Sequence, residues 1–93
     1  MSHKFLVHYI GDSVGVAIDD IAAGEEVLGV FLEDDSTILI HSNHQIPLGH
    51  KIALHDISEN SRVIEYRVPI GVAMEAIKEG SYVHTHNLKT ARW

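Results

Sequence analysis

Length, composition and charge place the chain in a narrow class of proteins. Its 93 residues suit one domain with a single modest core, so we treat residues 1–93 as one unit. The absence of cysteine excludes disulfides and cysteine-ligated zinc or iron–sulfur sites. A formal net charge of −6 argues against nucleic acid, whose phosphates are bound through cations. The apolar runs are far shorter than a membrane span of about 20 residues, and no apolar signal region opens the chain. We therefore expect a cytoplasmic protein without a membrane partner.

Four segments in the first half of the chain have the spacing of short strands bounded by turn residues. They are residues 4–10, 14–18, 26–32 and 37–41. The acidic residues 33–36 predict a hairpin turn, and residues 42–49, which include Pro47, predict a loop. Asp12 follows the first strand in a Gly-Asp turn, where we expect it to cap its own backbone.

The second half of the chain adds three strands and one segment with helical spacing. The strands are predicted at residues 50–54, 62–66 and 81–88. Residues 71–79 place their apolar side chains on one face of a helix, between Pro69 and Gly80, so we predict a short helix there. The fold class that follows is mostly β, with short helical turns and one short helix.

One pattern, Ile-x-x-Gly/Asn-x-x-Val, occurs three times. It covers residues 20–27, 56–63 and 76–83. Gly and Asn adopt a left-handed backbone more easily than other residues. Each copy therefore predicts a short helical turn that a left-handed residue caps, followed by a strand.

The segment His84-Thr85-His86-Asn87 is the strongest chemical signal in the chain. Within a strand, His84 and His86 would share one face, where two imidazoles can bind a divalent metal or share acid/base work. The alternative is a pair of surface or half-buried histidines whose nitrogens bond backbone carbonyls. Asn87 is unfavourable within a strand, so it would orient a histidine, bind substrate, or end the strand.

A second histidine motif, His50-Lys51, lies in the middle of the chain. His50 shares its strand face with Ile52, so it is either a core histidine or a site residue. Lys51 projects to the opposite face, where it would meet an anionic substrate or solvent. His41 and His44 flank a loop without a motif partner, and we expect both to be exposed.

Four separated motifs carry a resemblance to a known family. They are residues 46–54, Asp56-Ile57, residues 69–73 and residues 77–88. With these motifs in order, the chain resembles the SAF domain of the altronate and galactarate dehydratases, a family that includes the alpha subunit of (2R)-sulfolactate sulfo-lyase. The resemblance implies a β-clip fold. It also implies the small subunit of a lyase, inactive alone, that contributes one wall of an active site completed by a larger catalytic subunit.

The resemblance also implies a reaction on an anionic hydroxy acid. A base removes the proton beside the carboxylate, and water or sulfite leaves from the neighbouring carbon. Family dehydratases depend on iron, so we expect a divalent metal, iron(II), bound by His84 and His86 or mainly by the larger subunit. The other reading is a non-catalytic binding module that orders a partner or senses a metabolite. Self-association is left open.

Two residues depart from the family pattern. Arg67 stands where the family has glycine after tyrosine, and Ser13 stands where it has asparagine. Because Arg67 restricts the backbone and adds a long cation, a different substrate is left open as well.

Overall fold

All regular elements over residues 2–90, the range that the computed structural model describes, are strands. Six strands form one sheet in the order β4-β3-β1-β2-β5-β8. They are β1 (His3–Val7), β2 (Val14–Ala17), β3 (Glu26–Phe31), β4 (Thr37–His41), β5 (Lys51–Ala53) and β8 (Tyr82–Val83). In this sheet β1 and β3 pair parallel, and the other neighbours pair antiparallel.

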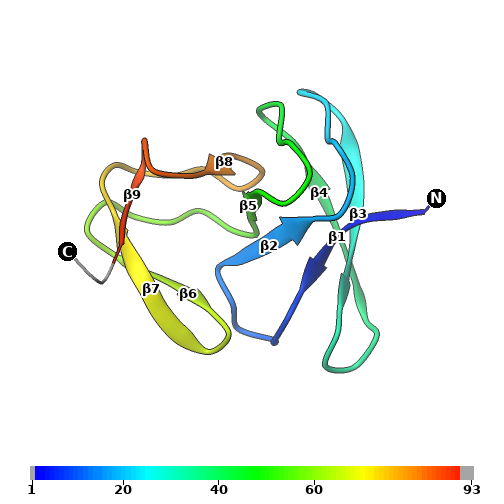
Figure 1. Ribbon diagram of the computed structural model, residues 1–93, viewed down its shortest axis with the longest axis horizontal. Coiled ribbons are helices and arrows are strands. Elements are labelled where there is room, and N and C mark those ends of the chain that lie inside the picture. The colour runs from blue at the N-terminus through cyan, green and yellow to red at the C-terminus, as the bar shows by residue number, and fades with distance from the viewer. Residues whose placement is uncertain (1, 91–93) are drawn as a thin grey trace.

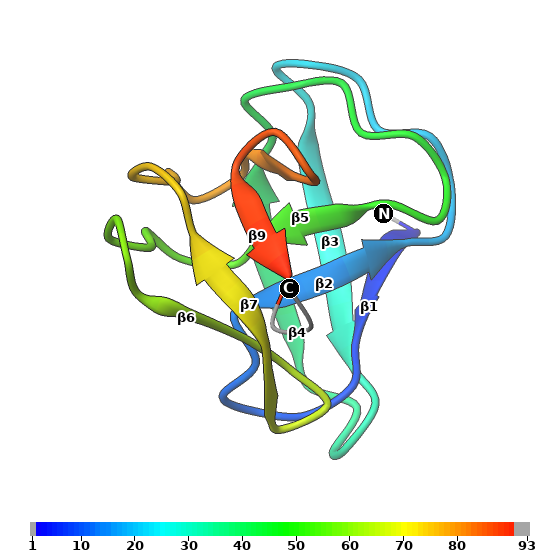
Figure 2. The same cartoon turned by 60° about the vertical axis from the view of Figure 1, so that its left-hand side comes forward.

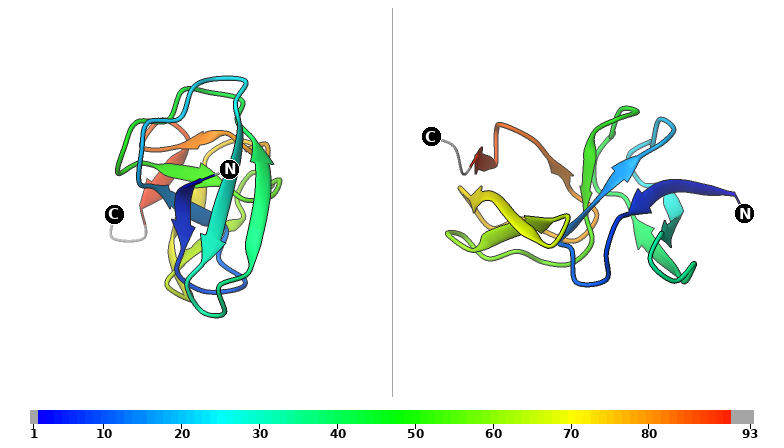
Figure 3. Two further views of the ribbon diagram at one scale, coloured as in Figure 1. Left: turned by 90° about the vertical axis from the view of Figure 1, so that its right-hand side faces the viewer. Right: turned by 60° about the horizontal axis from the view of Figure 1, so that its bottom comes forward.

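A second, smaller sheet packs beside the first. It contains β6 (Arg62–Glu65), β7 (Val68–Ala73) and β9 (Leu88–Thr90), all antiparallel, with β7 in the middle. Figure 1 shows β2, β5 and β8 in the centre of the molecule, with β1, β3 and β4 on one side and the small sheet on the other. The two sheets are separate in Figure 3 as well. The expected mostly-β fold of β-clip type is confirmed.

Two apolar clusters correspond to the two halves of this arrangement. The first lies around β1 and contains Phe5, Val7, Ala17, Ile21, Val27, Ile40, Ile46, Ile52 and Leu54. The second joins the sheets and contains Val14, Ala53, Ile57, Val63, Ala73, Ile77, Val83 and Leu88. Since β5 and β8 contribute to both clusters, the end of β8 lies between the cores.

Four β-turns of one kind lead into β3, β5, β6 and β8. In each turn the fourth N–H donates to the first carbonyl, and the third residue has a positive φ, as type II turns require. The third residues are Gly24 (80°), Gly49 (86°), Asn60 (69°) and Gly80 (85°). The left-handed residues expected in the three repeats are confirmed. The helical turns expected before them are wrong, because each turn closes over four residues.

The short helix expected at residues 71–79 is also wrong. Residues 68–73 are strand β7, and Ile77 forms an isolated bridge with Ile57. Gly71 lies so close to β9 that a Cβ there would be 2.3 Å from the carbonyl oxygen of Lys89. Sheet pairing on both sides of β7 therefore outweighs an apolar spacing that also fits a helix.

The strand expected at residues 81–88 is shorter than predicted. Strand β8 ends at Val83, and residues 84–87 form a turn in which the N–H groups of Asn87 and Leu88 both donate to the carbonyl of His84. The loop at residues 42–49 and the hairpin turn at residues 33–36 are as expected. Over residues 2–90 there is no helix of the length and apolarity that a membrane crossing requires.

Candidate functional site

Tyr82 is the centre of a cluster of histidine rings. Its hydroxyl is joined to Nδ1 of His50 by a hydrogen bond of 2.7 Å, and the two rings meet edge to face. The ring of His84 stacks on Tyr82 with a centroid distance of 5.5 Å, and the ring of His86 lies 5.7 Å away at a tilt. His50 and His84 are in contact too, at 5.1 Å. Two motifs more than 30 residues apart in the sequence therefore meet at one point.

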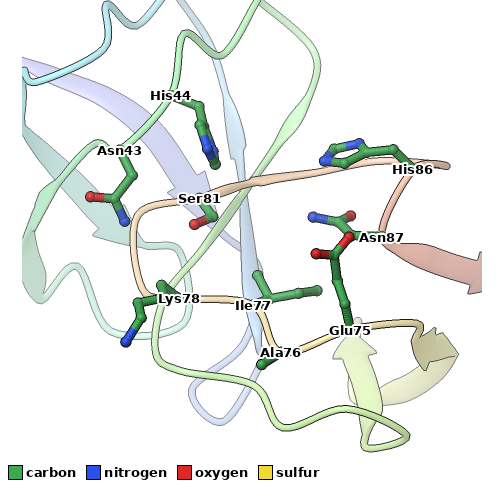
Figure 4. Close-up of a pocket in the computed structure, with 9 residues that line it drawn as sticks. All are labelled: Asn43, His44, Glu75, Ala76, Ile77, Lys78, Ser81, His86 and Asn87. Carbon is green, nitrogen blue, oxygen red and sulfur yellow. The ribbon is translucent and has the colours of Figure 1, made fainter.

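A surface pocket of about 440 Å³ lies beside this cluster. Its lining includes His44 from the β4–β5 loop, Glu75 after β7, and His86 with Asn87 from the turn after β8. Figure 4 shows the rings of His44 and His86 pointing toward the pocket from these two loops, with the Glu75 carboxylate directed toward Asn87. The pocket thus brings imidazoles and a carboxylate from three segments to one hollow.

His44 is tied to the same cluster through the backbone. The N–H of Tyr82 donates to Nδ1 of His44 at 3.2 Å. A neutral imidazole that accepts at Nδ1 carries its proton on Nε2, which leaves that N–H for a ligand. His44 and His41 are exposed, as expected, and His44 also has this contact with the backbone of Tyr82, which no sequence motif indicated.

Asn87 fixes the turn that carries the two exposed histidines. Its side chain is buried, with an exposed fraction of 5%, and accepts from the N–H of His84 at 2.9 Å. Its amide nitrogen donates to the carbonyl of Tyr82 at 2.8 Å. Both contacts go to the backbone, so Asn87 sets the course of the chain through His84. His84 and His86 therefore project from a turn instead of sharing the face of a strand.

Lys51 points away from the histidine cluster, toward the second sheet. Its Nζ lies 3.9 Å from Oε1 of Glu65 in β6. Glu65 is 5% exposed, and its burial raises the pKa of the carboxyl, while nearby Lys51 and His8 act in the opposite direction. A buried carboxyl beside a half-exposed ammonium is a second feature with acid/base potential.

The departure from the family at Arg67 has a structural explanation. Tyr66 and Arg67 are the two central residues of the β6–β7 hairpin turn, with φ of 56° and 62°. Their N–H groups donate to the carboxylate of buried Asp12, each at 3.1 Å. The Arg67 guanidinium lies 4.2 Å from the centre of the Tyr9 ring and pairs with Glu33. Figure 2 shows the hairpin turn beside the β1–β2 loop that carries Asp12.

Asp12 and Ser13 make more contacts than the sequence indicated. Asp12 accepts from the N–H of Tyr9 within its own turn, as predicted, and also holds the second sheet. His8 stacks on Tyr66 with a centroid distance of 4.0 Å. The hydroxyl of Ser13 accepts from the N–H of Ile64, so this second departure also has a place between the sheets.

The residues present do not by themselves fit a metal centre. Among residues 2–90, no three histidine, aspartate or glutamate side chains are grouped so that they could hold an ion. His84 and His86 lie in the same turn, and both of their rings contact the ring of Tyr82. The binding of iron(II) by His84 and His86 stays a prediction.

Comparison with protein families identifies the family of this chain. Residues 3–91 match the model described as the altronate/galactarate dehydratase SAF domain. The chain belongs to this family.

Relatives of this SAF domain occur both as whole chains and as parts of longer enzymes. The alpha subunit of (2R)-sulfolactate sulfo-lyase from Chromohalobacter salexigens is 40% identical over 94 aligned residues, which cover all of both chains. That of Paracoccus pantotrophus is 39% identical over 67 residues, covering 72% of this chain and all of that subunit. Altronate dehydratase from Escherichia coli is 40% identical over 79 residues, which are 85% of this chain but 15% of that enzyme. The relatives are thus lyases.

The SAF domain assembles some of the expected site residues and separates others. His50, His84 and His86 meet around Tyr82, and Asn87 supports their turn. Lys51 lies apart from them, beside Glu65. Sequence reasoning missed Tyr82, His44, Glu75 and Glu65. Tyr82 and Glu65 lie in strand patterns, and His44 and Glu75 lie in loops, so none of them carries a spacing signal. Their neighbours come from segments that are distant in the sequence.

Proposed function

We propose that this SAF domain is the small subunit of a lyase acting on a hydroxy acid, of the altronate or galactarate dehydratase type or the sulfolactate sulfo-lyase type. In this proposal it forms one wall of an active site that a larger subunit completes. The observation that carries the proposal is the gathering of His50, His84 and His86 around Tyr82, beside a surface pocket, in a chain whose relatives are lyases.

The chemistry of these side chains suits removal of a proton next to a carboxylate. His84 and His86 are exposed imidazoles, the side chain that most often serves as a general base or acid in enzymes. The Nε2–H of His44 can donate to a carboxylate oxygen of the substrate, since its Nδ1 is already an acceptor. The hydrogen bond between the Tyr82 hydroxyl and Nδ1 of His50 holds the His50 ring, against which His84 packs. Lys51 faces Glu65 and not the pocket, so we do not assign it a contact with the substrate.

In this proposal the larger subunit supplies the groups that stabilise the carbanion. The carbanion formed next to a carboxylate needs a metal or a set of cations, and the described residues do not form a metal centre. We therefore assign the divalent metal, expected to be iron(II), mainly to the larger subunit. A chain similar to the rest of altronate dehydratase, outside the 15% that this domain matches, is the candidate for that subunit.

Replacing His84 or His86 with alanine tests the proposal. Loss of an acid/base group typically lowers the rate about 10²–10⁴-fold, whereas an exposed imidazole adds little to the core. We expect such a loss in the reconstituted two-subunit enzyme, assayed with altronate, galactarate and sulfolactate, and a nearly unchanged thermal midpoint. His55→Ala is the matched control, because His55 is exposed and its Nδ1 bonds the neighbouring carbonyl of Asp56.

Two results would contradict this proposal. Turnover by the 93-residue chain alone would show that its active site is complete without a larger subunit. Full activity of both histidine variants in the complex would remove the histidines from the site. Loss of activity in proportion to loss of folded protein would assign them a structural role.

A second candidate function is a non-catalytic module that orders a larger partner. It is favoured by the internal bonding of the cluster, since Nδ1 of His44 and Nδ1 of His50 are both engaged by Tyr82. In this case the histidine variants would weaken assembly and leave the rate of the assembled enzyme unchanged.

A further inference from the structure

The outer face of β7 carries a row of apolar side chains at the surface. Val72 is 38% exposed, and Met74, just past the end of the strand, is 52% exposed. Pro69 is exposed as well, and its partner across the sheet, Ile64 of β6, is half-buried. Val72 and Pro69 pair with alternate residues of β6, Arg62 and Ile64, so Val72, Pro69 and Ile64 lie on one side of the small sheet. The row runs along the central strand of that sheet toward the end of β7.

This row leads directly to the histidine pocket. The N–H of Met74, at the end of the row, donates to the carbonyl of Asn87 at 2.8 Å. The next residues, Glu75, Ala76 and Ile77, line the pocket. A molecule that covers the row therefore also reaches the open side of the candidate site.

Two cations flank the row in a chain that is acidic as a whole. Val72 is paired across the sheet with Arg62 of β6 on one side and with Lys89 of β9 on the other. Directly paired antiparallel residues project to the same face, and both cations are exposed. Against a net charge of −6, this face offers an apolar strip between two positive charges.

We propose that this β7 face is the docking surface for the larger lyase chain, which presents an apolar ridge bordered by carboxylates. The proposal rests on the proposed function above. Continuity with the pocket supports it, because one partner then covers both the apolar row and the incomplete site. A relative supports it as well, because in altronate dehydratase the matching domain is 15% of a much longer polypeptide. A second copy of this chain fits less well, since packing the face on itself about a two-fold axis brings like charges together.

Two substitutions and one matched control test this surface. Val72→Glu and Met74→Glu place a carboxylate in the row, and Leu39→Glu makes the same change at a 50% exposed position on β4, in the other sheet. Binding is measured by titration calorimetry with the separately purified larger chain, a homologue of the remainder of altronate dehydratase. We expect each β7 variant to bind about 30-fold or more weakly, as hot-spot residues do, and Leu39→Glu to bind within about threefold of the parent chain.

The charge of the partner is tested separately. Lys89→Glu should weaken binding and make it less sensitive to salt, because it removes one of the flanking cations. Urea unfolding of each variant confirms that it is folded before binding is measured.

Each alternative outcome has a distinct meaning. Unchanged binding by folded Val72→Glu and Met74→Glu in an active complex would overturn the surface and leave the proposed function standing. Sedimentation of the chain alone as a dimer that Val72→Glu dissociates would make a second copy the occupant and overturn the proposal. If the parent chain neither binds nor activates the larger chain, the proposed function itself fails.

Discussion

Tyr82 determines how the histidines of this domain lie relative to one another. Its hydroxyl reaches His50, its N–H reaches His44, and its ring contacts both His84 and His86. The pairing of β5 with β8 and the turn that follows set the backbone positions of His50, His84 and His86, whereas His44 lies in the β4–β5 loop. The ring of Tyr82 is what holds the imidazoles in one group.

Tyr82→Phe separates the role of the hydroxyl from that of the ring. It keeps the contacts with His84 and His86 and removes the bond to Nδ1 of His50, which is worth about 0.5–1.5 kcal/mol. We expect a small fall in thermal midpoint and a loss of about tenfold in turnover of the two-subunit enzyme, with an altered pH profile. Tyr66→Phe, at the hairpin turn, is the control. An unchanged pH profile in Tyr82→Phe would show that His50 works without this bond.

At the residue scale, the motifs of the sequence pointed to His50, His84, His86 and Asn87, but the strand face expected for His84 and His86 is wrong. The end of the strand was one of the roles left open for Asn87. The strand assumed for His84 and His86 ends at Val83, because the Asn87 side chain and the His84 carbonyl close a turn there. Such a turn depends on bonds across three residues that a period-2 pattern cannot reveal. The contacts of Tyr82 and His44 depend on long-range pairing, so no local pattern could identify them.

At the scale of elements, the β6–β7 hairpin shows how a side chain compensates for an unfavourable backbone. Two-residue hairpin turns need a positive φ at both central residues, for which glycine is suited. Here Tyr66 and Arg67 occupy these positions, and Asp12 accepts from both N–H groups. The side chain of Arg67 also contacts Tyr9 in the β1–β2 loop and Glu33 in the β3–β4 turn, at the end of the other sheet.

Two substitutions at Arg67 distinguish backbone strain from side-chain contacts. Arg67→Gly and Arg67→Ala both lose the contacts with Tyr9 and Glu33, but only glycine relieves a left-handed backbone that costs about 1–2 kcal/mol. We therefore expect the glycine variant to be more stable than the alanine variant by about 1 kcal/mol in urea unfolding. Equal stability of the two variants would mean that the turn changes its conformation when the arginine is removed.

Most strands were predictable because their apolar side chains alternate, and β4 was predicted with its observed bounds. The helix expected at residues 71–79 failed for a definite reason. Val72, Ala73, Ala76 and Ile77 have a spacing that suits a helix, but β7 also offers N–H and C=O groups to strands on both sides. Those partners are distant in sequence, so local spacing alone favoured the wrong element.

At the scale of the whole molecule, the two sheets are joined by an ion pair whose acid is buried. Burial raises the pKa of Glu65 above the ordinary carboxyl value of 4.5, and Lys51 reaches it from β5. In the folded chain the carboxyl therefore holds its proton to higher pH than in the unfolded chain. The contribution of Glu65 to stability is fully present below the unfolded pKa and is lost as pH rises through the raised pKa.

Glu65→Gln removes this titration and tests it. We expect the free energy of unfolding of the parent chain to fall relative to that of the variant as pH rises from about 4 to 7. Because both proteins keep the same histidines, the difference between their urea-unfolding curves isolates Glu65. Lys51→Met should extend the fall to higher pH and make it larger, because Lys51 lowers the pKa of Glu65 and its removal raises that pKa further. Parallel curves for parent and Glu65→Gln would contradict the raised pKa.

The four turns with a left-handed third residue belong to four similar units, which differ in the length of the strand that follows the turn. Each unit is an isoleucine in a bridge, a β-turn and a strand, and the bridges join the units in two pairs, Ile21 with Ile46 and Ile57 with Ile77. In three units the strand continues for three to six residues, but in the fourth, β8 stops after two. The residues that leave the sheet there are His84 and His86. In the fourth unit sheet pairing thus ends after two residues, and the turn that follows carries the exposed imidazoles.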